Sequence, residues 1–137
     1  MPGETNLRKL LAAMTPVLRP EEYVFQTLPP GESPPAGIEP FATVREDEGL
    51  TVVIEHRLTG EPAAAGEPVA DDVYRAITLG VHSSLRAVGF MAEVARKLAD
   101  NDIPANVIAG YHHDHVLVPA ASAQQAMMLL RELSYLG

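Results

Sequence analysis

Residues 74–119, with the sequence YRAITLGVHSSLRAVGFMAEVARKLADNDIPANVIAGYHHDHVLVP, decide how this chain folds. Residues 75–81 alternate so that Ile77, Leu79 and Val81 share one face, and this alternation is typical of a strand with one buried face. A polar turn, an amphipathic helix and two short strands follow in order. The rest of the chain is therefore expected to support this unit or to form a diverged partner of it.

A helix is predicted directly after the polar turn at 82–84. Apolar residues recur there at helical spacing and form one stripe, which comprises Leu85, Val88, Ala92, Ala95 and Leu98. The helix should end at Asn101-Asp102, because Pro104 directs the residue before it into an extended conformation. This helix should lie across the sheet.

The C-terminal part of the chain completes a recognisable order of elements. Strands are predicted over 105–110 and 115–118, with a turn at 111–114, and a second helix over 121–136. Its packing side should consist of Ala123, Met127, Leu130 and Leu133 or Ser134. The order β-α-β-β-α is a ferredoxin-like half that lacks its last strand. The first half of the chain must supply that strand.

The first half offers one helix and three strands for this purpose. A helix capped by Thr5 should bury an apolar stripe, and Pro16 and Pro20 should end it. The stripe is formed by Leu7, Leu10, Leu11 and Met14. Strands are predicted over 22–28, 41–46 and 50–56, and the proline-rich residues 29–40 must form a loop. We expect an α+β fold in which both halves form an antiparallel sheet with helices on one face.

Two connections organise this first half. Gly49 supplies the positive φ that a tight hairpin turn favours, and the charge run at 45–48 should be a solvated tip of that hairpin. Residues 59–68 (TGEPAAAGEP) form a low-complexity connection. The predicted domain organisation is accordingly an N-terminal half at 1–70 and a C-terminal half at 71–137.

Composition excludes several classes of function. The net charge is −8, with 11 acidic and 5 basic residues in the first 70 and 7 and 5 in the rest, and the basic residues are scattered. Nucleic acid is therefore not an expected partner. The absence of cysteine excludes disulfides, thiol nucleophiles and thiolate metal sites. No apolar run approaches the roughly 20 residues of a membrane span, and no signal peptide is evident, so a cytoplasmic location without membrane contact is expected.

The segments ITLGVHSSLRAVGF, KLADNDIPANVIAGYHHDH, GETNLRKLLAAM and ATVREDEGLTVV resemble the ACT domain family of small βαββαβ ligand-binding modules. The resemblance is to small proteins in which two ACT-like halves are fused, and residues 98–108 are also similar to the regulatory region of aspartate kinases. It implies that an effector, often an amino acid, binds at an interface between ACT units. ACT domains usually regulate an attached catalytic domain, and this sequence contains none.

The resemblance also implies where a ligand would bind. The expected ligand-binding residues surround the turn after the first strand of the C-terminal half and include one residue of a neighbouring strand: His82, Ser83, Ser84, Leu85, Val88, Gly89 and Asn106. A helix N-terminus at this turn could bind a carboxylate, and an Asn side chain offers both a donor and an acceptor. Equally, Ser83 or Ser84 could simply cap the helix, and Asn106 could bond a neighbouring loop.

The cluster His112, His113, Asp114 and His115 is the sharpest local concentration of metal-ligand types. Strand alternation would direct His112 and Asp114 to one side and His113 and His115 to the other, so a polar turn is the simpler interpretation and no metal is expected. A serine nucleophile is not expected either, because the sequence has no GxSxG motif.

The function predicted from the sequence is regulatory binding of a small molecule of the amino-acid type. We expect no catalysis and no cofactor, and a homodimer would create the interface at which such modules bind ligands. An alternative is a protein-interaction module that keeps the ACT fold without a ligand. Metal binding by the histidine cluster is a third interpretation.

Overall fold

The computed structural model describes residues 6–59, 67–68, 73–81 and 86–136. These residues divide into two compact units, one built from Met1–Pro20 with Arg75–Gly137 and one from Glu21–Tyr74. The N-terminal helix therefore packs with the C-terminal part of the chain. None of the helices in the described ranges is long and apolar enough to cross a membrane.

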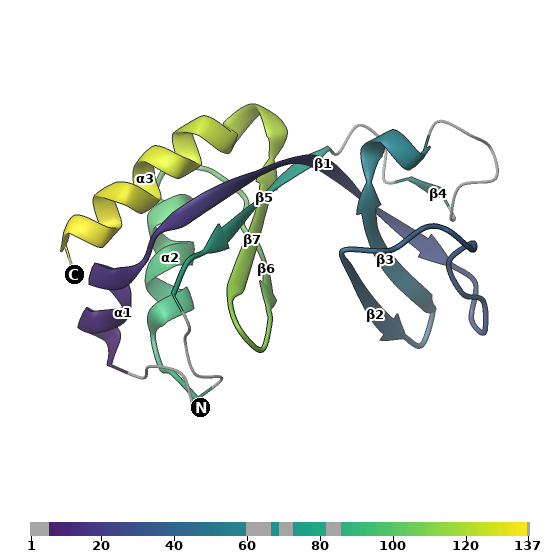
Figure 1. The fold of residues 1–137 in the computed structure, drawn as a ribbon, viewed down its shortest axis with the longest axis horizontal. Coiled ribbons are helices and arrows are strands. Elements are labelled where there is room, and N and C mark those ends of the chain that lie inside the picture. The colour runs from purple at the N-terminus through teal and green to yellow at the C-terminus, as the bar shows by residue number, and fades with distance from the viewer. Residues whose placement is uncertain (1–5, 60–66, 69–72, 82–85, 137) are drawn as a thin grey trace. The chain divides into compact units, whose positions relative to one another are not determined.

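The first unit is a sheet with helices packed on one face (Figure 1). Its strands are ordered β1-β5-β7-β6. The elements of this unit are α1 (Leu7–Ala13), the first part of β1 (Pro16–Leu28), β5 (Tyr74–Leu79), α2 (Phe90–Ala99), β6 (Asn106–Ala109), β7 (Asp114–Pro119), the 3-10 turn η2 (Ala120–Ser122) and α3 (Ala123–Leu136). The strand that the C-terminal half lacks is supplied by β1, as the sequence predicts.

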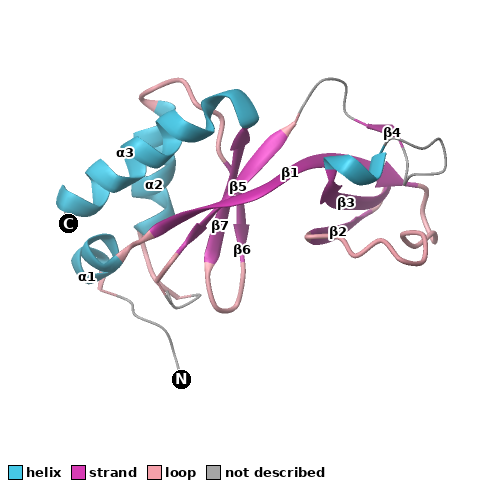
Figure 2. Cartoon of the chain, turned by 45° about the horizontal axis from the view of Figure 1, so that its top comes forward, coloured by secondary structure: helices cyan, strands magenta, loops and turns pink. Residues whose placement is uncertain are grey.

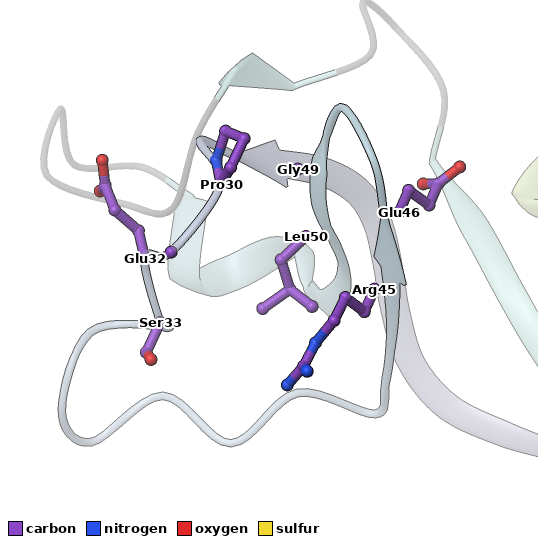
Figure 3. Close-up of a pocket in the computed structure, with 8 residues that line it drawn as sticks. Pro30, Glu32, Ser33, Arg45, Glu46, Gly49 and Leu50 are labelled. Atoms are coloured by element: carbon purple, nitrogen blue, oxygen red, sulfur yellow. The ribbon is translucent and has the colours of Figure 1, made fainter.

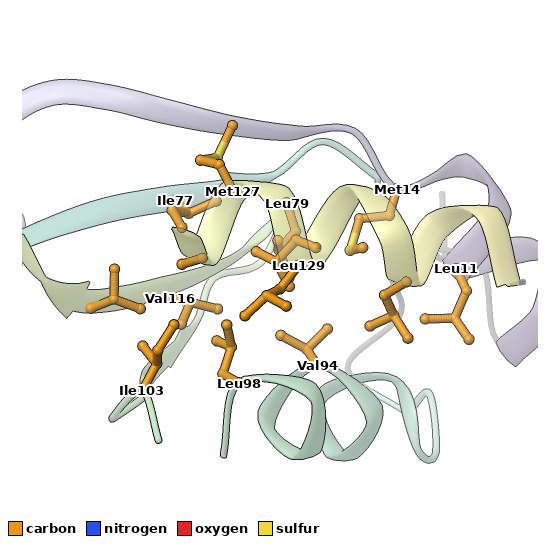
Figure 4. Packing of buried hydrophobic residues seen from close by; sticks show 14 of the residues in the cluster. Leu11, Met14, Ile77, Leu79, Val94, Leu98, Ile103, Val116, Met127 and Leu129 are labelled. Carbon is orange, nitrogen blue, oxygen red and sulfur yellow. The ribbon is translucent and has the colours of Figure 1, made fainter. Parts of the chain in front are cut away.

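The core of this unit fills the space between the sheet and the helices α1, α2 and α3 (Figure 4). The predicted stripe of the first helix is confirmed, since Leu10, Leu11 and Met14 are buried and Leu7 packs against the cluster. The sheet contributes Ile77, Leu79, Val116 and Val118, and α3 contributes Ala123, Ala126, Met127, Leu129, Leu130 and Leu133. The apolar residues that alternate along each strand and those at helical spacing along each helix are thus buried in one core.

The start of α2 differs from the prediction. The helix begins at Phe90, and its buried residues are Phe90, Val94 and Leu98. Val88 precedes the helix and is 84% exposed, and Ala92 is exposed, so the predicted stripe is wrong at these two positions, while Leu98 is buried and Leu85 lies outside the described residues. The reason is Gly89, which has a left-handed φ of 91° and forms the N-cap rather than a position inside the helix.

The boundaries of α1 and β1 also differ from the prediction. The N-cap of α1 is Asn6, whose Oδ1 accepts the Lys9 N–H at 3.0 Å, whereas Thr5 lies outside the described residues. Strand β1 begins at Pro16, six residues before the predicted start at Glu22, and includes Pro20. Pairing with β3 begins only at Tyr23, so neither proline interrupts that ladder.

The second unit is a smaller sheet formed by the later part of β1 with β2 (Ala42–Glu46), β3 (Gly49–Glu55) and the short β4 (Glu67–Pro68) (Figure 2). The 3-10 turn η1 (His56–Thr59) follows β3 in the chain. Its apolar cluster contains Val24, Leu28, Val52 and Ile54. The predicted hairpin is confirmed, with Glu46 paired to Gly49. A Cβ at Gly49 would lie 2.2 Å from the Leu28 carbonyl oxygen. Glycine is therefore required at this position both by this close approach and by the hairpin turn.

We predict that Leu130→Ala destabilises the protein by about 2–5 kcal/mol, because this fully buried side chain fills the core and its loss leaves a cavity. Urea unfolding followed by circular dichroism measures this change. The matched control is Met128→Ala in the same helix, where the side chain is 61% exposed and the change should stay within about 0.5 kcal/mol. Equal losses in the two variants would contradict the assignment of this core.

Candidate functional site

The candidate site lies at the end of the first unit where β5 leaves the sheet and α2 begins. Four of the predicted ligand-binding residues, His82, Ser83, Ser84 and Leu85, lie outside the described residues. Their described neighbours are Val81 on one side and Arg86 to Gly89 on the other. The chemistry of the site is therefore built from these flanking residues and from the elements packed beside them.

The N-terminus of α2 presents backbone N–H groups at this end. Gly89 has no side chain to cap them, and within the described ranges no side chain makes a cap hydrogen bond at this position. The amides of the first helical turn have no partner within a helix, and the helix dipole adds partial positive charge. A carboxylate is a suitable partner for such a terminus. The Leu7 side chain of α1 lies near Gly89, since a Cβ added to Gly89 would lie 3.5 Å from the Cδ2 of Leu7.

The turn between β6 and β7 lies beside the same end of β5. The Nδ1 of His113 lies 3.3 Å from the Val81 carbonyl oxygen, and the Gly110 N–H donates to the His113 carbonyl at 3.0 Å. These contacts hold the turn against the residue that leads into 82–85. Sequence reasoning did not find this contact of His113 with Val81, because it spans 32 positions.

The other histidines of the cluster have different surroundings. The ring of His112 stacks edge-on against Tyr111, with the centroids 5.2 Å apart. Asp114 is 7% exposed, whereas His115 is half-buried and its Nδ1 lies 3.0 Å from the Thr78 hydroxyl. Across the described part of the chain, no group of three or more His, Cys, Asp or Glu side chains is arranged to hold a metal ion.

Asn106 lies at the opposite end of the β6–β7 ladder. It pairs with Leu117, and its Nδ2 donates to the Leu117 carbonyl at 3.5 Å. The other end of the ladder pairs Ala109 with Asp114, next to the turn that contacts Val81. Because four strand residues span about 10 Å, Asn106 lies about that far along the strand from the end of the ladder next to the turn.

Comparison with known proteins agrees with this architecture. Two family models, both described as ACT domain, match residues 2–62 and 69–132. A protein of unknown function from Vibrio cholerae, described as a possible transport protein, is 44% identical, with coverage of 93% of this chain and 95% of that chain and a TM-score of 0.81. No curated protein matches the chain.

More distant structures share the fold. The ligand-free regulatory subunit of aspartate kinase from Thermus thermophilus is 10% identical, with coverage of 90% of this chain and 97% of that chain and a TM-score of 0.65. An Agrobacterium tumefaciens protein is 17% identical over 88% and 89% of the two chains, with a TM-score of 0.68. The α+β fold is thus the ferredoxin-like type of regulatory ACT subunits. The chain belongs to the ACT domain family and carries two ACT domains in tandem.

The environment of His115 makes the stability of the protein depend on pH. Burial lowers the pKa of His115 below its usual 6.5, and the Arg19 charge and His113 lower it further, while Asp114 acts in the opposite direction. The unfolded chain then binds a proton at a higher pH than the folded chain does. Stability should therefore be full above pH 6.5 and should fall as the pH drops from there toward the folded pKa.

We predict that His115→Asn reduces the pH dependence of the free energy of unfolding below pH 6.5. Urea unfolding of both proteins at a series of pH values between neutrality and mild acid measures the difference. Titrating carboxylates contribute to both curves, and the subtraction removes them. An unchanged slope in the variant would contradict a lowered pKa for His115.

Proposed function

We propose that this protein is a regulatory module that binds a small metabolite of the amino-acid type and has no catalytic activity of its own. The observation that carries the proposal is the α2 N-terminus, which lacks a side-chain cap and lies in an ACT domain. A ligand carboxylate would accept hydrogen bonds from the backbone N–H groups of this terminus. The similarity to an aspartate kinase regulatory subunit supports a regulatory role.

The proposal treats residues 1–70 and 71–137 as two ACT-like halves of a cytoplasmic protein. The ligand-binding residues remain those predicted from the sequence, namely His82, Ser83, Ser84, Leu85, Val88, Gly89 and Asn106, and His113 joins them through its contact with Val81. The 84% exposure of Val88 leaves this side chain available to a ligand or to another subunit.

A homodimer is part of the proposal, because Asn106 lies on β6 at one edge of the strand order. Strand β6 is the last in the strand order and carries no charged residue, and Val107 in it is 42% exposed. Uncharged edge strands readily pair with another chain. Pairing two copies through β6 would place both Asn106 side chains at the interface. If the protein is instead an interaction module without a ligand, the same edge of β6 would pair with a strand of a different protein.

We predict that one or more of the standard amino acids raises the melting temperature of the protein. A ligand at about 100 times its Kd stabilises the folded state by about 2.7 kcal/mol. Differential scanning fluorimetry with millimolar ligand detects this change. Asn106→Ala should weaken the binding of the stabilising ligand, whereas the control Gln125→Ala, an exposed amide on α3, should not. The proposal fails if no amino acid shifts the transition.

The homodimer has a separate test by analytical ultracentrifugation. Val107→Lys places a charge on the β6 edge and should shift the protein toward monomer, because edge lysines block strand pairing. Val44→Lys is the matched control, since Val44 is 55% exposed on β2, the last strand at the other end of the order. Dissociation by Val44→Lys and not by Val107→Lys would assign the interface to β2 instead.

A further inference from the structure

We propose that the β6–β7 turn, residues 110–113, is a latch that holds Val81 at the end of β5 near neutral pH and opens when His115 takes up a proton. The turn joins the two strands at one end of the first unit (Figure 1). Opening would release the carbonyl of Val81, the residue that leads into positions 82–85 of the candidate site. This regulatory consequence rests on the proposed function, whereas the opening itself does not.

His113 makes the contact that holds Val81. Its Nδ1 lies 3.3 Å from the Val81 carbonyl oxygen, and because a carbonyl oxygen only accepts hydrogen bonds, this nitrogen is the donor. The preceding residue, Gly80, is anchored to the chain before β1, since its N–H donates to the Thr15 carbonyl at 2.8 Å. The chain is thus fixed through Thr15 up to Gly80 and through the β6–β7 turn at Val81.

The same turn covers the imidazole of His115. The Gly110 N–H donates to the His113 carbonyl at 3.0 Å and closes the turn. A Cβ added to Gly110 would lie 2.6 Å from the His113 carbonyl oxygen and 3.4 Å from the Nε2 of His115, so glycine allows the turn backbone to come this close to the ring. The Nδ1 of the ring lies 3.0 Å from the Thr78 hydroxyl of β5. His115 therefore lies between the turn and β5.

The groups around His115 oppose its protonation. Burial lowers its pKa most, and the Arg19 guanidinium of β1 and His113 of the turn lower it further, while the adjacent Asp114 acts in the opposite direction. Strand β6 contains no titratable side chain. The charged residue of β5 is Arg75, whose guanidinium donates to the Arg19 carbonyl at 2.7 and 3.0 Å. A proton on His115 would thus join a region that already contains positive charge.

The proton therefore binds more tightly when the turn is open. Opening exposes the ring to water and brings its pKa back toward the usual 6.5, whereas the closed turn keeps the pKa below that value. The population of the open state should rise as the pH falls below 6.5, by at most about tenfold per pH unit for one proton, until the pH passes the pKa of the closed state. Because local opening needs less free energy than global unfolding, the core of the unit stays folded.

Amide hydrogen exchange of the ¹⁵N-labelled full chain, followed by nuclear magnetic resonance from neutrality to mild acid, tests the latch. The protection factor of the Gly110 N–H should fall by up to about tenfold per pH unit below pH 6.5, because opening breaks its hydrogen bond. One control is the Asp100 N–H, which donates to the Arg96 carbonyl at the end of α2 at 2.8 Å. The other is Gly49, which is paired with Glu46 in the β2–β3 hairpin, a turn without histidine (Figure 3). Both controls should keep their protection over this range.

Variants identify the titrating group. His115→Asn should make the Gly110 protection factor independent of pH over this range, whereas His56→Asn, at an exposed histidine of η1, should leave the pH dependence intact. Arg19→Gln keeps the imidazole and removes a charge that opposes its protonation, so the total fall should be smaller. A Gly110 protection factor that stays constant with pH, or that falls equally in His115→Asn, would overturn the proposal. A parallel fall at Asp100 would assign the effect to unfolding of the whole unit and would overturn it too.

The link to the candidate site is measured by isothermal titration calorimetry with the standard L-amino acids other than histidine, whose α-carboxylate does not titrate in this range. The Kd of each amino acid that binds should rise in mild acid for the unmodified protein and stay constant for His115→Asn. Equal pH dependence in the two proteins would overturn the link between the latch and the site. If no amino acid binds, the proposed function fails, and the exchange of Gly110 still decides whether the latch exists.

Discussion

The burial of the β5 and β7 apolar face under α1, α2 and α3 is the constraint on which the rest of the first unit depends. Each strand contributes alternate residues to this core, and each helix contributes one apolar stripe. The burial of these residues therefore also fixes the direction of the remaining side chains on each element. His115 and Thr78 alternate with core residues on their strands and meet through a hydrogen bond of 3.0 Å. The turn at His113 contacts Val81, which lies just beyond the end of β5.

The recruitment of α1 and the first part of β1 into this core explains how two ACT domains share one chain. The β-α-β-β-α order of the C-terminal half leaves one side of β5 without a neighbouring strand, and β1 pairs with β5 on that side. The later part of β1 pairs with β3 in the second unit. The first unit therefore consists of two separate stretches of sequence and the second of the stretch between them, although the two family matches follow each other along the chain.

Sequence patterns predict the parts of this fold that depend on local periodicity. The stripe of α1, the β2–β3 hairpin and the packing side of α3 are such parts, because each is defined by spacing within a few turns or residues. The start of α2 was not predictable in this way, since Gly89 is compatible with a helix interior and with a cap, and only its φ of 91° distinguishes the two.

The candidate sites depend on contacts between distant residues, which a single sequence does not encode visibly. The position of Asn106 at the end of the β6–β7 ladder away from the turn follows from the register that pairs Asn106 with Leu117. The contact of His113 with Val81 likewise arises from folding.

The central claim is that an amino-acid carboxylate binds at the N-terminus of α2. A crystal structure of the protein grown with the amino acid that stabilises it most tests this claim directly. We expect density for the ligand carboxylate within hydrogen-bond distance of the backbone N–H groups that follow Gly89. Density for the ligand only elsewhere, with this terminus bound by water alone, would contradict the account.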